Sequence, residues 1–158
     1  MDAIHWDHCL LVASPQTTSD KRMNIRLFLA LEKVADADAS VAVAWAGTVP
    51  YYSRHRCVDL LGKCDPYIAH LPAIPGIRRP GHNKYDIAYS LSRHKPDVVL
   101  HALPLKERVF RQRYRPVAVE VDGEQVAFFV RNASRHVHGG VAIPLQRAVE
   151  IIRRQQRE

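Results

Sequence analysis

Apolar and polar residues alternate along the first two thirds of the chain in two periods, one typical of helices and one typical of buried strands. Apolar positions with helical spacing span about residues 20–35, and continuous apolar runs follow at 41–46 and 98–102. A run that is apolar throughout is typical of a strand covered on both faces of a sheet. A second segment with helical spacing, 85–94, precedes the second run, so helices and buried strands are predicted to alternate.

The last third of the chain changes to a pattern typical of antiparallel strands. Residues 116–121 and 124–131 are rich in β-branched and aromatic side chains, and Asp122-Gly123 separates them. Asp-Gly between two such runs is a strong signal for a tight hairpin turn. A final helix is predicted to begin near Pro144.

These elements predict one α/β domain over residues 1–158, with a mainly parallel sheet flanked by helices and an antiparallel hairpin at one edge. The strands of the two continuous apolar runs are expected to be adjacent or near-adjacent and parallel. A short strand at 9–13 and a helix from Pro104 to about residue 113 complete the prediction. We find no repeat or linker that would divide the chain.

The segment between the first strand and the second helix, residues 48–84, has poor periodicity and frequent prolines. Asp65-Pro66 predicts the capped start of a short helix, and residues 72–83 are predicted to be loop. Because the segment follows the strand at 41–46, we expect it at the carboxyl edge of the sheet. Ligands usually bind at that edge in open α/β folds.

Composition agrees with a folded globular domain. Apolar residues make up 47% of the 158 positions and charged residues 25%, which are ordinary values. No apolar run approaches the roughly 20 residues of a membrane helix. The first residues carry acids where a secretory signal carries positive charge, so a cytoplasmic location is expected if Met1 is the natural start.

The net charge of +7 permits an anionic partner. Much of the excess lies in two groups of arginines, one before the hairpin and one at the C-terminus: Arg108, Arg111, Arg113 and Arg115, and then Arg153, Arg154 and Arg157. A solvated helix face explains both groups, and a nucleic-acid interface is the alternative.

Three cysteines, Cys9, Cys57 and Cys64, are too few for a disulfide framework and have no CxxC spacing. His55 lies near Cys57, but one such pair does not make a four-ligand pattern. The chain also has no glycine-rich phosphate loop. The sequence therefore predicts neither a metal site nor a cofactor.

Aromatic and acidic side chains within 48–84 predict a polar ligand site. Tyr51 and Tyr52 offer flat faces on which a sugar ring can stack. Asp59 and Asp65 can accept hydrogen bonds from hydroxyl groups. Packing of the tyrosines at a chain corner and pairing of Asp59 with an arginine are the structural alternatives.

Basic residues in the same segment complete the predicted site. Four of them can hold a phosphate or carboxylate group: Arg54, Arg56, Lys63 and Lys84. His82 lies in a loop beside charged groups, which suits either a proton-transfer residue or a hydrogen-bonding anchor of the loop. No serine or cysteine in a nucleophile-elbow context accompanies it.

Three motifs occupy this segment in order: WAGTVPYYSR at 45–54, VDLLGKCD at 58–65 and PGHNKYD at 80–86. Together they resemble the signature of the C-terminal soluble domain of bacterial multi-membrane-spanning, C-type glycosyltransferases, which use polyprenyl-phosphate sugars. The resemblance covers about residues 10–102. It implies a stand-alone or excised domain of that kind, extracytoplasmic in the second case. The catalytic carboxylate of those enzymes lies between membrane helices that this chain lacks.

The predicted function is therefore non-catalytic: binding of a small polar or anionic, sugar-like ligand, or of a protein partner or second copy. One alternative is a stand-alone enzyme that acts on a sugar-phosphate-like substrate through His82, Lys84 and Asp59. Another is a nucleic-acid-binding module.

The geometry expected of the site follows from its loops. Residues 50–56, 62–65 and 81–86 are expected to converge at the sheet edge, because such loops stay ordered when charged groups pair across them. Asp59 would then lie within hydrogen-bonding reach of Arg54, Arg56 or Lys84.

Overall fold

The computed structural model describes residues 18–77 and 82–155, so the strand predicted at 9–13 lies outside the described residues. Within the described part, one sheet of six strands has the order β2-β1-β3-β5-β4-β6. The strands are β1 (Ser40–Val43), β2 (Arg56–Asp59), β3 (Val98–Val99), β4 (Tyr114–Val121), β5 (Glu124–Arg131) and β6 (Val141–Ala142).

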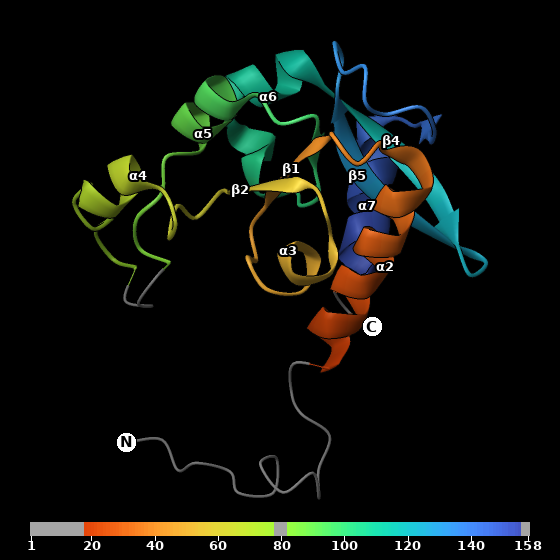
Figure 1. The fold of residues 1–158 in the computed structure, drawn as a ribbon, viewed down its shortest axis with the longest axis horizontal. Helices are drawn as coiled ribbons and strands as arrows, with labels where there is room; N and C mark the ends of the chain where they lie inside the picture. Colours follow the sequence, from red (N-terminus) through yellow and green to blue (C-terminus); the bar gives the residue numbers. More distant parts are fainter. Residues whose placement is uncertain (1–17, 78–81, 156–158) are drawn as a thin grey trace, which may run out of the picture.

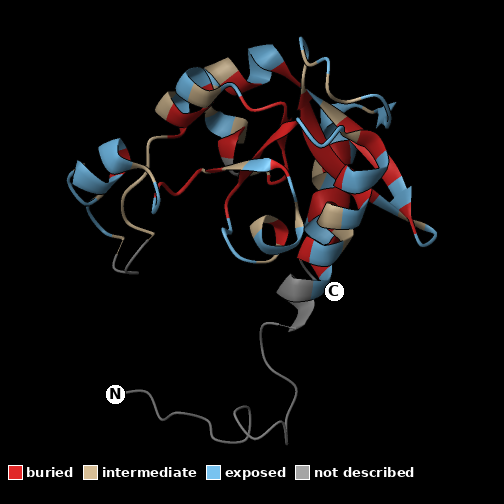
Figure 2. Ribbon diagram, viewed as in Figure 1, coloured by how far each residue is buried: buried red, intermediate tan, exposed pale blue. Residues whose placement is uncertain are grey.

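Helices cover both faces of this sheet (Figure 1). In chain order they are α2 (Thr18–Val34), α3 (Thr48–Tyr52), α4 (Pro66–His70), α5 (Ile87–His94), the 3-10 helix η1 (Leu103–Lys106), α6 (Arg108–Arg113) and α7 (Leu145–Gln155). Helix α2 packs on one face in a cluster that includes Leu27 and Phe128. Helices α5, α6 and α7 pack on the other face, around Phe110 and Phe129. The buried strands therefore lie between two helical layers (Figure 2).

The sheet confirms the predicted α/β class and the predicted neighbours. Strand β1 pairs in parallel with β3, with Val41 opposite Val98, and also in parallel with β2. Strand β5 joins β3 in the antiparallel sense, and β4 and β6 continue that half. Two of these five pairings are parallel and three are antiparallel. The sheet is therefore mixed rather than mainly parallel, because the hairpin strands are the longest in the sheet and recruit β6.

The predicted hairpin turn is confirmed in detail. Asp122 has φ 52° and Gly123 has φ 78°, and Val121 pairs with Glu124. Two successive positive φ angles define the two-residue turn that matches the twist of antiparallel strands.

The predicted bounds of α2, α4 and α5 and the predicted start of α7 hold to within two or three residues, including the Asp65 cap of α4. The single helix predicted from Pro104 to about residue 113 is wrong, because Glu107 is extended and divides it into η1 and α6.

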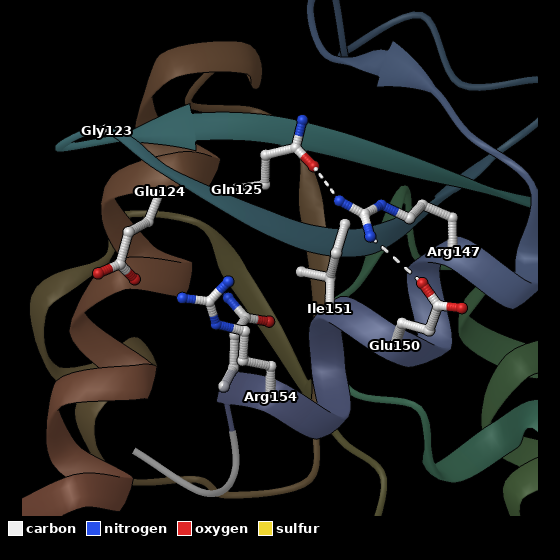
Figure 3. A pocket seen from close by; sticks show the side chains of 8 residues that line it. Gly123, Glu124, Gln125, Arg147, Glu150, Ile151 and Arg154 are labelled. Carbon is white, nitrogen blue, oxygen red and sulfur yellow. Dashed lines mark hydrogen bonds and ion pairs between the residues drawn. The ribbon is translucent and has the colours of Figure 1, made fainter.

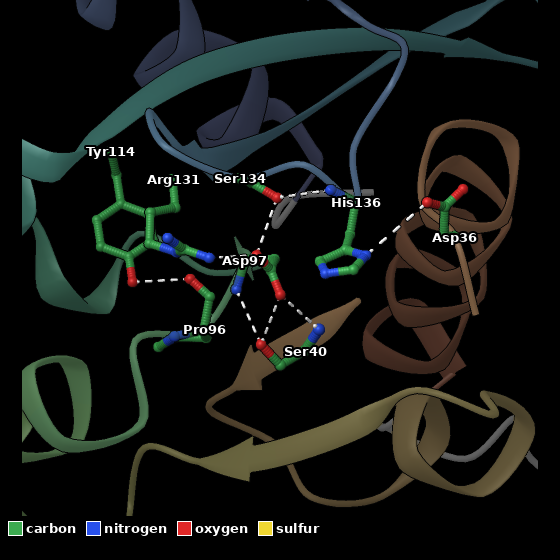
Figure 4. Close-up of polar contacts among 8 residues, drawn as sticks. All are labelled: Asp36, Ser40, Pro96, Asp97, Tyr114, Arg131, Ser134 and His136. Carbon is green, nitrogen blue, oxygen red and sulfur yellow. Dashed lines mark hydrogen bonds and ion pairs between the residues drawn. The ribbon is translucent and has the colours of Figure 1, made fainter. Parts of the chain in front are cut away.

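A buried carboxylate ties the starting ends of β1 and β3 to the end of β5 (Figure 4). The carboxylate of Asp97 accepts hydrogen bonds from the backbone and hydroxyl of Ser40, from Ser134, and from the guanidinium of Arg131. Burial alone would raise the pKa of Asp97, but these hydrogen bonds outweigh it and hold the pKa below its ordinary value. Asp97 therefore stays ionised and has a structural role.

None of the helices in the described ranges is long and apolar enough to cross a membrane.

Candidate functional site

A groove follows the open edge of the sheet along β2. Its volume is about 470 Å³, and it is lined by the whole of β2 and by side chains from both helical layers: Val43, Ala46, Pro50, Cys64, Asp65 and His94. Strand β2 has a neighbour only on its β1 side. The backbone edge of β2 therefore lies along the groove, with α3 on one side and the α4–α5 region on the other.

The sequence positions two carboxylates in this groove by making each of them hold a turn. Asp59 ends β2, and its two oxygens accept the backbone N–H groups of Leu61 at 2.9 Å and Lys63 at 2.8 Å. Asp65 caps α4 by accepting the N–H groups of Tyr67 and Ile68. Both carboxylates line the groove, and these hydrogen bonds fix them in position before any ligand arrives.

His94, at the end of α5, lies next to the carboxylate of Asp65. Its Nε2 lies 3.3 Å from Oδ2 of Asp65. Burial would raise the pKa of Asp65, but the hydrogen bonds from Ile68, His94 and Tyr67 outweigh that effect and lower the pKa. Asp65 is therefore a hydrogen-bond acceptor at neutral pH and a poor general acid.

The groove also contains one cation and two thiols. Arg56 is exposed, and among the described residues its guanidinium has no ion-pair partner. Cys64 is exposed and Cys57 is half-buried, and burial raises the pKa of Cys57. No hydrogen bond joins Cys64 to His94, so the described part of the chain holds no assembled thiol–imidazole pair. It also holds no cluster of three metal-ligating side chains.

The two tyrosines predicted to stack on a sugar lie outside this groove. Tyr51 and Tyr52 are on α3, 80% and 59% exposed, and line a shallow apolar hollow together with Ile25 of α2. Their rings meet edge to face at 4.9 Å, and Tyr52 contacts Phe28. They form a surface patch beside the groove.

Except for Arg56, the predicted basic residues and His82 also lie outside the lining of the groove, at separate positions. Lys84 donates from Nζ to the carbonyl of Ala69 at 2.8 Å, which fixes its loop to α4. The His82 ring lies 5.7 Å from the ring of Trp45. Arg54 and Lys63 are exposed.

The predicted convergence is therefore partial. Loops 50–56 and 62–65 meet at the groove, through Pro50, Arg56 and Asp65. The loop from 82 onwards reaches Trp45 instead, and residue 81 is outside the described part. The expected pairing of Asp59 with Arg54, Arg56 or Lys84 is wrong, because backbone amides of its own turn satisfy the carboxylate first.

A different cavity, of about 310 Å³, lies between the hairpin turn and α7 (Figure 3). Its carboxylates are matched by cations: Arg26 holds Glu124 at 2.6 and 3.1 Å, and Arg147 holds Glu150 at 3.2 Å. Because both carboxylates there are already paired with cations, whereas Arg56 has no ion-pair partner among the described residues, the groove along β2 is the stronger candidate for a polar ligand.

Sequence reasoning missed His94 and the two cysteines as groove residues. His94 is 29 positions from Asp65 in the sequence. The apolar spacing of its helix, α5, indicates which residues pack on the sheet and gives no information about His94. Arg56, Cys57 and Asp59 share one strand, and alternation of apolar and polar residues is the signal that could have identified it. Strand β2 has only four residues, which is too short for that alternation to be recognised.

Comparison with known proteins gives one match. A family model described as Domain of unknown function (DUF8728) covers residues 14–139. No curated protein and no solved structure matched the chain.

Proposed function

Because the chain belongs to the DUF8728 family, whose description names no activity, we propose its function from the groove alone: it is a non-catalytic domain that binds a small polar or anionic ligand, such as a sugar or sugar phosphate. The observation that carries the proposal is the groove's lining. It combines the unpaired guanidinium of Arg56 with the fixed carboxylates of Asp59 and Asp65 over apolar side chains.

Each class of group has a distinct part in this proposal. The guanidinium supplies a planar set of donors for a phosphate or carboxylate. The carboxylates accept hydrogen bonds from hydroxyl groups, and the accessible side chains of Ala46 and Pro50 provide an apolar wall for a sugar ring. A volume of about 470 Å³ falls in the range of about 300–1,000 Å³ typical for small-molecule sites.

The geometry favours binding over catalysis. Both carboxylates accept hydrogen bonds from backbone amides, and the lowered pKa of Asp65 makes that residue a poor proton donor. The enzyme alternative required His82, Lys84 and Asp59 to act together, but only Asp59 lines the groove. The similarity to the C-terminal domains of C-type glycosyltransferases stays a prediction, and it agrees with a non-catalytic role.

The exposed thiol of Cys64 provides a direct test. We expect sugar phosphates, screened as glucose 1-phosphate, galactose 1-phosphate and the free sugars, to slow alkylation of Cys64 by iodoacetamide, measured by peptide mass spectrometry. Arg56→Gln should remove the protection by the phosphorylated sugars, whereas Arg54→Gln, an exposed arginine two residues away, should keep it. If no compound in the screen slows alkylation in the native protein, the groove is not a saccharide site.

A further inference from the structure

A second cavity lies where the C-terminal ends of α5 and α6 meet the end of β5. Its volume is about 390 Å³. Three segments distant in sequence form it, at residues 91–95, 112–114 and 131–133. It is separate from the groove along β2, since the two share no lining residue.

The charges around this cavity are positive. Lys95 and Arg113 are exposed and have no ion-pair partner in the described part of the chain. Arg131 is paired with Asp97 behind the cavity, and its Nε is buried with no hydrogen-bond partner among the described residues. The lining residues include no carboxylate. Two cations therefore remain in excess after the Arg131–Asp97 pair is counted as neutral.

Three of the carbonyl groups at these helix ends already accept hydrogen bonds within the protein. A helix C-terminus exposes carbonyl oxygens with partial negative charge. At the end of α6 the carbonyl of Arg113 accepts the Asn132 N–H at 2.7 Å, and the carbonyl of Gln112 accepts the Asn132 side-chain amide at 3.3 Å. The Lys95 N–H likewise bonds the carbonyl of Leu91. The cationic side chains are therefore the exposed charge that a ligand meets.

The inner wall is neutral and partly apolar. Tyr114 is buried and its hydroxyl donates to the carbonyl of Pro96 at 2.9 Å (Figure 4). Burial raises the pKa of Tyr114 to about 12, so the phenol carries no negative charge at neutral pH. Ala133, which is exposed, adds a small aliphatic surface to the same cavity. A ligand with an anionic head and an apolar or aromatic body would match both parts.

We propose that this cavity binds a small organic phosphate monoester, whose phosphate lies between Lys95 and Arg113 and whose organic part lies against the exposed edge of Tyr114 and against Ala133. A phosphate presents several acceptor oxygens to guanidinium and ammonium donors.

The competing explanation is that Lys95 and Arg113 only stabilise the negative ends of the two helices. That role predicts a loss of stability on substitution and no ligand. The proposal predicts a loss of binding, so the two are separated by measuring both quantities on the same variants.

The test is isothermal titration calorimetry of the full chain at constant ionic strength with phenyl phosphate, inorganic phosphate and phenol. We expect phenyl phosphate to bind more tightly than inorganic phosphate, and phenol not to bind. Arg113→Gln and Lys95→Gln should each weaken phenyl phosphate binding about tenfold, the size of one lost charge-assisted hydrogen bond. Arg108→Gln, at the opposite end of α6, is the matched control and should change the affinity less than twofold.

Three results would overturn the proposal. In the first, Arg113→Gln and Lys95→Gln lower the unfolding free energy while the affinity for phenyl phosphate stays unchanged. In the second, Arg108→Gln weakens binding as much as Arg113→Gln, which would indicate diffuse attraction to a basic surface. In the third, Arg56→Gln alone removes binding, which would assign the phosphate to the groove along β2.

Discussion

Acidification is expected to destabilise this protein through His101, a neutral histidine buried beyond the end of β3. The residue is 7% exposed. Its Nδ1 accepts the backbone N–H of Ala44 at 3.3 Å, and its Nε2 lies 3.4 Å from Oδ1 of Asn24. A backbone N–H can only donate, so Nδ1 is unprotonated and the proton is on Nε2, directed to the Asn24 oxygen. Protonation of Nδ1 would break the bond to β1 and bury a charge.

The magnitude follows from the shift in pKa. Burial lowers the pKa of His101 from 6.5 to about 4. Between these values the unfolded chain binds a proton that the folded protein does not, so the unfolding free energy falls as the pH falls. At about 1.4 kcal/mol per pH unit the full loss is about 3 kcal/mol, complete near pH 4. Above pH 6.5 both states are neutral at this position and the contribution is constant.

Urea denaturation at pH 7.5, 5.5 and 4.5 measures this loss, with His101→Asn as the comparison. The asparagine oxygen can still accept the Ala44 N–H, and the variant cannot titrate at this position. We expect the native protein to lose about 2 kcal/mol more than the variant between pH 7.5 and 4.5. Every other histidine is common to both proteins, so equal losses in the two would show that His101 is not the responsible group.

Four substitutions, in two matched pairs, test the packing and the ion pairs. Gly62→Ala places a Cβ 2.3 Å from the Cγ2 atom of buried Ile68 at φ 65°, and should cost about 3 kcal/mol by chemical denaturation. Gly123→Ala has the same strain at φ 78° but meets nothing within 4 Å, so a loss of about 1 kcal/mol is expected, and equal losses at the two glycines would contradict the steric argument. Asp97→Asn leaves Arg131 without a counter-charge and should lower the unfolding free energy by about 3 kcal/mol. Glu150→Gln, at an exposed ion pair, should lower it by less than about 1 kcal/mol. A small loss for Asp97→Asn would mean that solvent reaches the cluster around Asp97.

The elements that the sequence predicted are those with a local cause. The hairpin has one: Asp122 and Gly123 both have positive φ, and the turn residues alone specify that geometry. The Asp65 cap and the helix after it are equally local. The parallel pairing of β1 and β3 followed from apolar runs that only a doubly covered strand explains.

The elements that the sequence did not predict are short and held by tertiary contacts. Helix α3 contains Pro50 and two exposed tyrosines, so no helical face marks it. Strand β2 has four residues, of which only Val58 is buried, and its pairing with β1 is what makes it a strand. The groove depends on both elements. The set of residues that line the groove could therefore not be predicted from the sequence, although Asp59 and Asp65 had been predicted as site residues.

Hydrogen bonding to the backbone of their own turns explains why Asp59 and Asp65 have positions typical of site residues. Asp-x-Leu and Asp-Pro-Tyr are turn and cap patterns, in which the carboxylate serves the backbone first. A polar side chain in an irregular segment is more often fixed by its own loop than by a ligand. The residues without such a local partner are the better guide to function, and here Arg56 is one of them.

That reasoning applies to the charge of the whole molecule. The chain has 23 lysines and arginines against 16 aspartates and glutamates, and several of the acids are used by the fold: Asp59, Asp65 and Asp86 hold turns and helix starts, Asp97 holds Arg131, and Glu124 holds Arg26. The fold therefore engages more of the acidic than of the basic side chains in these contacts. At the cavities, Arg56 lies in the groove together with the carboxylates of Asp59 and Asp65, whereas Lys95 and Arg113 lie in the second cavity, whose lining includes no carboxylate. A positive excess at a concave surface favours anionic ligands, and only the second cavity has such an excess. The groove instead combines one guanidinium for a phosphate or carboxylate with two acceptors for hydroxyl groups.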